Sequence, residues 1–298
     1  MFQEFRGKLQ KLTYFEFEGH DRHEGINLGL TEAELLAELQ KIPAGDLFLG
    51  RYTDDEIRAM FVRHGVLTAL AELGYPDVTI ETATHNVYNH RLYVFVGTRD
   101  YDHMLMELRV REGIFRPREQ FVPGLELGPL PMILIDWAML QNPRRSFSPD
   151  RPALPQQRYP GLGLLPSLVP LVMEVVVESG RKGVLDVPDH YHSALFYSRW
   201  FKFFNPGMEG RFQAMRRDLG LLPLQQISIA FERNCIVETN SGAVENWVPG
   251  EQLLPLSPEL NTYFMSPGYE AIREKAFREA RYHFDRERFE RKGEKHDP

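Results

Sequence analysis

Residues 153–204 contain the side chains whose types and spacing are best suited to chemistry. Arg158, Gly161 and Gly163 form the pattern R-x-x-G-x-G immediately before a strongly apolar run. Glycines let backbone amides approach an anion closely, and the start of a following helix adds a partial positive charge. This arrangement is typical of a loop that holds a phosphate group, although Gly and Pro also mark ordinary turns.

The elements that must position this loop follow one another in a definite order. The apolar run predicts a helix that stops at Ser179-Gly180, and the next short apolar run predicts a buried strand that ends at Pro188. After the loop, we therefore expect a helix over residues 164–178, a strand over 184–187, a helix over 193–201 and a strand over 201–204.

In this order the chain resembles the GNAT superfamily of acyl-CoA-dependent N-acyltransferases. The donor motif of that family is R/Q-x-x-G-x-G/A, often with a proline three residues earlier, and Pro155 has this position here. The resemblance covers residues 130–235 and departs from the family at Pro170, inside the helix, and at Trp200, where the family usually has glycine. The later family motif, A-x-x-F-Y-x-x-x-F, is matched by Ala194, Phe196, Tyr197 and Phe201.

The resemblance implies roles for individual residues. Tyr197 would be the general acid that protonates the departing thiolate, because the unperturbed pKa of a phenol is near that of a thiol. The alternative for Tyr197 is a packed tyrosine whose hydroxyl is satisfied. The pyrophosphate of coenzyme A would be held by backbone amides flanked by Arg158, namely those of Gly161, Leu162, Gly163 and Leu164.

Acyl transfer to an amine also needs a route for the proton that leaves the acceptor. Asp136 lies in an apolar run, and its pKa is expected to be raised if the side chain is buried. The alternative is a carboxylate in a solvated cleft with no chemical role. Glu107 and Glu126 are weaker candidates, and acceptor-side residues would gather near His190 and His192. For the 3′-phosphate of coenzyme A the candidates are Arg144 and Arg145, with a solvated loop as the alternative.

The first half of the chain predicts two helices followed by strands. A capping box at Thr31 and Glu34 predicts one amphipathic helix, and a second should begin near Thr53 and end at Gly74. Residues 12–17 also predict a strand, but less clearly than the segments that follow. The main strands are expected over residues 78–84, 91–97, 104–110 and 132–140, the last buried on both faces.

After the two motifs the pattern becomes more helical and more charged. We expect a helix over residues 205–220, a strand over 226–231, an irregular covering segment over 236–262 and a charged helix over 269–289. The apolar stripe of that helix would dock on the core or on a second subunit, giving a possible homodimer. The predicted organisation is a GNAT-like domain over residues 1–235, with its donor-binding half at about 130–235, and a C-terminal covering segment and helix over 236–298.

Composition limits the class of protein. The 298 residues are 43% hydrophobic, which is enough for a sizeable core, and the net charge of −7 argues against nucleic-acid binding. One cysteine, Cys235, excludes an intrachain disulfide framework and a thiolate zinc cluster. No metal site is expected, because the run that contains His20, His23 and Glu24 matches no ligand spacing and suits a polar loop. Without a long apolar run or a secretory signal, we expect a cytoplasmic protein with no membrane span.

The sequence thus predicts an α/β or α+β fold of the GNAT type, with a mixed, mostly antiparallel central sheet flanked by helices and with N- and C-terminal extensions. The expected function is that of an N-acyltransferase, which moves an acetyl or other acyl group from acyl-CoA to a primary amine by direct attack. The acidic surface favours a cationic small-molecule or peptide acceptor. The alternatives are a GNAT-like module that binds acyl-CoA without catalysis, and an unrelated fold in which the glycine loop is only a turn.

Overall fold

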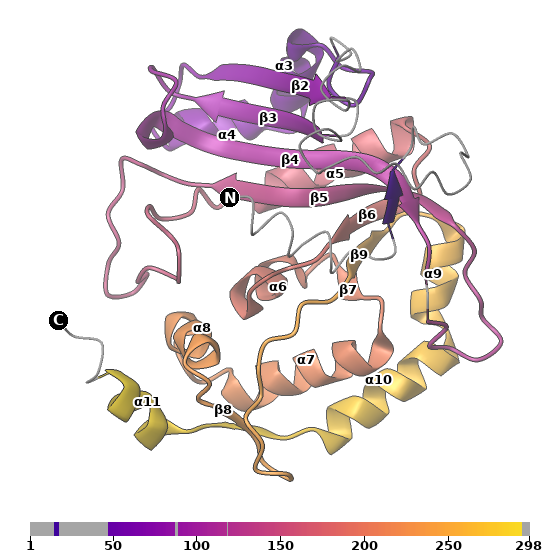
Figure 1. The fold of residues 1–298 in the computed structure, drawn as a ribbon. Coiled ribbons are helices and arrows are strands. Elements are labelled where there is room, and N and C mark those ends of the chain that lie inside the picture. Colours follow the sequence, from indigo (N-terminus) through magenta and orange to yellow (C-terminus); the bar gives the residue numbers. More distant parts are fainter. Residues whose placement is uncertain (1–14, 18–46, 87–88, 118, 294–298) are drawn as a thin grey trace, which may run out of the picture.

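The computed structural model describes residues 15–17, 47–86, 89–117 and 119–293. Its centre is a mixed sheet in which all described neighbours are antiparallel except β5 and β6, which are parallel. A short strand, β1 (Phe15–Phe17), pairs with the far end of β4. The seven main strands lie in the order β2 (Thr79–Asn86), β3 (Asn89–Phe95), β4 (Met104–Phe115), β5 (Leu130–Leu140), β6 (Gly183–Asp186), β9 (Gln252–Pro255) and β7 (Lys202–Phe203) (Figure 1).

Helices pack on both faces of this sheet, so the predicted mixed sheet with flanking helices is confirmed. On one face, α3 (Asp54–Arg63), α4 (Val66–Glu72) and α5 (Leu165–Glu178) cover a core that includes Ile133 and Ile135 of β5. The alternate side chains of β5, Met132 and Leu134, face the other way and pack against α9 (Pro258–Met265). Full burial of each such side chain contributes about 1.5–3 kcal/mol to the free energy of folding.

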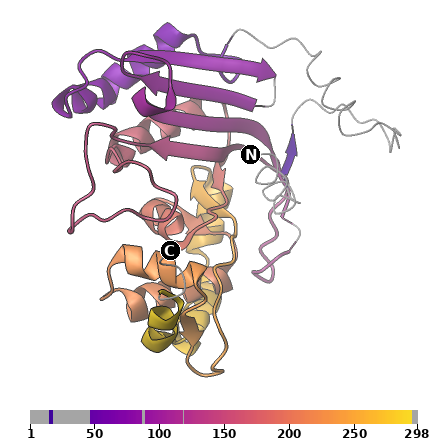
Figure 2. The same ribbon diagram turned by 60° about the vertical axis from the view of Figure 1, so that its left-hand side comes forward.

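The C-terminal helices gather at the β7 end of the sheet, away from β2 (Figure 2). They form a third apolar cluster around Phe212 and Phe231. A small two-stranded sheet, β8 (Ile236–Glu238) with β10 (Tyr282–Phe284), closes this region. The helices are α6 (Tyr191–Tyr197), α7 (Pro206–Leu219), α8 (Leu224–Glu232), α10 (Pro267–Glu279) and α11 (Arg286–Gly293).

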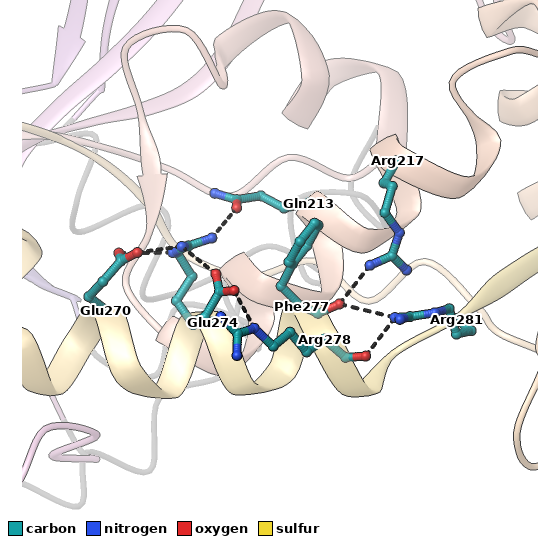
Figure 3. Close-up of polar contacts among 8 residues, drawn as sticks. Gln213, Arg217, Glu270, Glu274, Phe277, Arg278 and Arg281 are labelled. Atoms are coloured by element: carbon teal, nitrogen blue, oxygen red, sulfur yellow. Dashed lines mark hydrogen bonds and ion pairs between the residues drawn. The ribbon is translucent and has the colours of Figure 1, made fainter.

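Helices α7 and α10 lie side by side because Gly210 removes a side chain from their contact. A Cβ atom at Gly210 would lie 2.1 Å from the carbonyl oxygen of Arg273. Polar contacts extend the interface, and Arg217 of α7 donates a 2.8 Å hydrogen bond to the carbonyl oxygen of Phe277 (Figure 3). Arg273 also donates to the side-chain oxygen of Gln213. The expected apolar stripe therefore docks within the chain, as far as residue 279.

Four expectations about secondary structure are wrong. Residues 226–231 form part of helix α8, not a strand, because Ile227, Ala230 and Phe231 all face the core at helical spacing. The predicted helix over 193–201 begins earlier and ends at Tyr197. The charged helix ends at Glu279, and residues 282–284 pair with β8 instead. The segment over 236–262 is not irregular, since it supplies β9, which lies between β6 and the edge strand β7 of the sheet.

The remaining predicted elements are found with small shifts in their ends. The helix expected from Thr53 is present but divides into α3 and α4 at Gly65, whose φ of 69° is left-handed. Helix α5 continues through Pro170. The helix expected at Thr31 and the loop with His20, His23 and Glu24 lie outside the described residues. Within the described part of the chain, every helix is too short or too polar to cross a bilayer.

Candidate functional site

The parallel pairing of β5 and β6 stops where β6 ends, part-way along β5. Their last paired residues are Ile135 and Asp186, after which β5 continues to Leu140 without β6 beside it. The register between β4 and β5 also shifts here, because Val110 pairs with Ile135 while Arg109 pairs with Trp137. This shift leaves one extra residue in β5, which is the geometry of a β-bulge. The bulge and the end of β6 lie at the same point, and together they leave an opening beside β5 in the sheet.

An apolar pocket of about 70 Å³ lies at this opening. Its lining exposes no polar surface and comes from several elements that are distant in sequence. The main contributions are Met106 and Leu108 of β4, Ala138 and Leu140 of β5, Leu165, Leu168 and Val172 of α5, and Tyr197 of α6. A pocket of this composition suits a flexible apolar chain or thioether more than a charged group.

The glycine loop lies against the end of β5 beside this pocket. A Cβ atom at Gly161 would be 3.7 Å from the carbonyl oxygen of Leu140, and Gly163 has a left-handed φ of 75°. Leu162 and Leu164 are buried in the core, whereas Gly161 and Gly163, which alternate with them, are exposed to solvent. The two leucines thus anchor the loop, and its solvent-facing side has backbone atoms but no side chains.

The amides of this loop are free to bind a ligand. Among the described residues, none accepts a hydrogen bond from the backbone N–H groups of Gly161, Leu162, Gly163 or Leu164. Helix α5 begins directly after them with Leu164 as its N-cap and with no side-chain cap. Unpaired donors and the partial positive charge of a helix start favour an anion at this position.

Arg158 lies to one side of the loop and is engaged elsewhere. Its guanidinium forms a 2.8 Å ion pair with Asp102 and lies over the rings of Tyr101 and Tyr159. Tyr159 donates a second hydrogen bond to the same carboxylate, at 2.8 Å. The pair is exposed to solvent, so Arg158 can be released to an anion at a small energetic cost.

Tyr197 is in the pocket wall, at the last position of α6. Its ring lies 5.6 Å from that of Phe201, and its hydroxyl makes no hydrogen bond with a described residue. Burial raises the pKa of Tyr197, and the negative charge of Asp186 raises it further. The side chain is therefore a neutral phenol at neutral pH and keeps a proton to donate.

Asp136, the other predicted catalytic residue, is held by an arginine. The bulge leaves Asp136 without a partner in the register but within reach of Arg111 of β4, whose Nε and Nη2 both donate to its carboxylate. The two side chains are 10% and 5% exposed, and neither lines the apolar pocket. The structure therefore brings Tyr197 and the glycine loop to one pocket but directs Asp136 to a buried ion pair.

The weaker candidates lie in different places. Glu107 contributes to the pocket wall, but its carboxylate accepts a 2.7 Å hydrogen bond from Arg109. Glu126 is exposed in the connection between β4 and β5. Arg144 packs over the ring of Tyr75 and donates to the carbonyl oxygen of Gly74, and Arg145 is exposed.

Sequence reasoning missed Asp186, which follows two apolar residues at the end of β6. It is 5% exposed and lies close enough to Tyr197 for its charge to act on the phenol. An acidic residue that ends a buried strand just before a proline was the available signal. His190 and His192 lie at the other end of α6, where they line a separate cavity.

Comparison with known proteins adds no assignment. No protein-family model matches the chain, and no curated protein matches its sequence. The described residues contain no cluster of three or more His, Cys, Asp or Glu side chains positioned to hold a metal ion.

Proposed function

We propose that this chain is an acyl-CoA N-acyltransferase with a GNAT-like fold. The observation that carries the proposal is the convergence of three features on one opening in the sheet. They are the unpaired amides of residues 161–164, the apolar pocket where β5 continues beyond the end of β6, and the hydroxyl of Tyr197, which has no hydrogen-bond partner among the described residues. A pyrophosphate, a pantetheine arm and a departing thiolate need these three environments in this order.

The order of the described elements supports a GNAT-like arrangement. Antiparallel strands lead to β5, and the glycine loop and α5 connect β5 to its parallel neighbour β6. The strand order then places the later strand β9 between β6 and β7. The resemblance of the two motifs to the GNAT family implies this same order of antiparallel strands, glycine loop, helix and parallel strand.

The proposed reaction is direct attack of an amine on the thioester. The amine nitrogen forms a bond to the carbonyl carbon, and the bond from that carbon to sulfur breaks. Tyr197 gives its proton to the departing thiolate, and the acceptor nitrogen loses a proton to solvent. A second proton from solvent restores the phenol, so atoms and charges balance. The acyl donor is acetyl-CoA or another acyl-CoA, and the acceptor is a primary amine.

Calorimetric titration with coenzyme A and acetyl-CoA tests the donor site. The wild type should bind with micromolar affinity, and Gly161→Glu should abolish binding because the new carboxylate repels the pyrophosphate. Gly128→Glu is the matched control, because Gly128 is in an exposed loop with open space around it. Failure of the folded wild type to bind either ligand would favour the unrelated fold, in which the loop is only a turn.

The ion pairs of the acids near the pocket favour a second candidate function, which is binding of acyl-CoA without catalysis. Asp136 is paired with Arg111, and Glu107 is paired with Arg109. A domain without a free carboxylate in the pocket suits an acyl-CoA-binding module that does not catalyse transfer. Thiol release from acetyl-CoA in the presence of a panel of amines separates the two functions. Binding without release would favour the module.

A further inference from the structure

A second cavity, of about 210 Å³, lies between the start of α6 and the helix α8. Its buried floor is made by Tyr191, His192 and Phe231, and its rim includes the exposed side chains of Asp189 and Glu232. The cavity shares no lining residue with the apolar pocket that contains Tyr197. Its volume is three times that of the apolar pocket, and its lining contains acids and histidines beside the aromatic rings.

Aromatic rings form the walls of this cavity and hold one another in place. The ring of Tyr191 stacks on that of Phe231 at 5.1 Å and meets the edge of Trp247 at 5.7 Å. Trp247 is fixed by a 3.0 Å hydrogen bond from its indole nitrogen to the carbonyl oxygen of Pro188. Faces of aromatic rings attract cations, and a rigid wall limits the entropy lost on binding.

His192 supplies a polar group that the fold does not use. The side chain is only 7% exposed, and its Nδ1 atom is fully buried without a hydrogen bond to a described residue. Burial and, to a smaller extent, the charge of the stacked His190 together lower the pKa of His192 to about 4. The imidazole is thus neutral near pH 7, with one nitrogen able to accept a hydrogen bond. A buried polar atom left unpaired destabilises the folded state, and a hydrogen bond from a ligand removes that cost.

The charges around the cavity favour a cation. Two of the nine lining residues, Asp189 and Glu232, are acids, and none is lysine or arginine. Arg216, whose charge acts on Tyr191, is not in the lining. At about 30 Å³ for each water-sized group, the volume accommodates on the order of seven non-hydrogen atoms. This size suits a short aliphatic amine or the end of a longer one.

We infer that the cavity between α6 and α8 binds a small organic ammonium ion, which lies against the rings of Tyr191 and Trp247, donates to His192 and pairs with Glu232 at the rim. The bound amine is also the acyl acceptor, a role that rests on the proposed function. The cavity and Tyr197 are at opposite ends of α6, about 8 Å apart along the axis by the rise of a helix.

Binding of 1,4-diaminobutane in the absence of acyl-CoA tests the site, with 1,4-butanediol as an uncharged probe of the same length. Changes in amide chemical shifts near Trp247 report occupancy. The wild type should bind the diamine at least tenfold more tightly than the diol. Equal affinity for the two probes, or no binding of the diamine, would overturn the assignment of an ammonium site.

Two variants locate the site. His192→Leu should weaken diamine binding at least tenfold, while His283→Leu, at an exposed histidine bonded to Thr239, should leave it unchanged. In case His192→Leu folds poorly, Glu232→Gln changes only the exposed rim and should weaken binding about threefold. Its control is Glu72→Gln on α4. Unchanged affinity in Glu232→Gln and in folded His192→Leu would place the diamine elsewhere.

The acceptor role has its own readout. Acetylated diamine should form with the wild type and fall at least tenfold in His192→Leu, with the affinity for acetyl-CoA unchanged. If product forms at the same rate in His192→Leu, the amine that reacts does not use this cavity, and the acceptor role is wrong. If acetyl-CoA does not bind at all, the proposed function fails, whereas diamine binding still decides the ammonium site.

Discussion

Arg111 donates two hydrogen bonds to the carboxylate of Asp136 across β4 and β5, and both side chains are almost fully buried. The pair exists because the β-bulge turns Asp136 towards β4 and away from the apolar pocket. Removing one member of a buried pair leaves an uncompensated charge. The pair therefore fixes the bulge where the sheet opens, and Asp136 has a structural task whatever its part in chemistry.

We expect Asp136→Ala to lower the free energy of unfolding by about 3–5 kcal/mol, because the buried guanidinium of Arg111 would lose the carboxylate that accepts two of its hydrogen bonds. Urea unfolding followed by circular dichroism measures the change. Glu279→Ala is the control, since its ion pair with Lys275 is exposed at both ends and should matter little. A loss for Asp136→Ala no larger than that of the control would contradict a structural role for the pair.

Tyr197→Phe should reduce kcat for acyl transfer by about 10²–10⁴, the usual contribution of a general acid. Affinity for coenzyme A should not change, because the phenol contacts neither the glycine loop nor the helix start in any described hydrogen bond. Steady-state kinetics and calorimetry give the two quantities. Tyr101→Phe, at an exposed ring, should be silent in both. Full activity in Tyr197→Phe would assign the proton to another donor.

The glycine loop and the helix that follows it are predictable from sequence because their signals are local. Gly161 and Gly163 precede an apolar run with a clear stop, so the loop and α5 follow from turn chemistry and spacing. The Arg111–Asp136 pair is different, because it depends on a register shift between strands that are separated by a long connection. A single sequence contains no signal for that register.

Two further errors have the same physical origin. The six residues of Q-I-S-I-A-F suit a strand or a buried helix equally well by periodicity, and packing decides for α8. Strand β9 is only four residues long, Gln252–Pro255, and its identity depends on pairing with β6, which is some 70 residues earlier. The cavity around His192 also needs α8 and Trp247 in place. Tertiary contacts, not local preference, create these features.

Gly210→Ala should destabilise the protein by about 1–3 kcal/mol, because an added methyl group must push α10 away from α7. The new Cβ atom would meet the carbonyl oxygen of Arg273 at 2.1 Å and the Cβ of Ala276 at 2.8 Å. Thermal unfolding measures the effect. Gly128→Ala adds the same methyl group in open space and should not lower the melting temperature. Equal melting temperatures for the two variants would mean that α7 and α10 are not in close contact.

Buried phenols should make the protein sensitive to alkaline pH. Burial raises the pKa of Tyr191 to about 12, whereas the unfolded value is near 10. The folded state therefore keeps a proton that the unfolded state loses, so this stabilising contribution is complete below pH 10 and is lost as the pH rises from 10 to 12. Tyr191→Phe keeps the ring in the cavity floor but cannot ionise, so its stability should fall less between pH 9 and pH 11 than that of the wild type. Urea unfolding at the two pH values measures both losses, and an identical loss in the two proteins would show that the phenol is not buried as described.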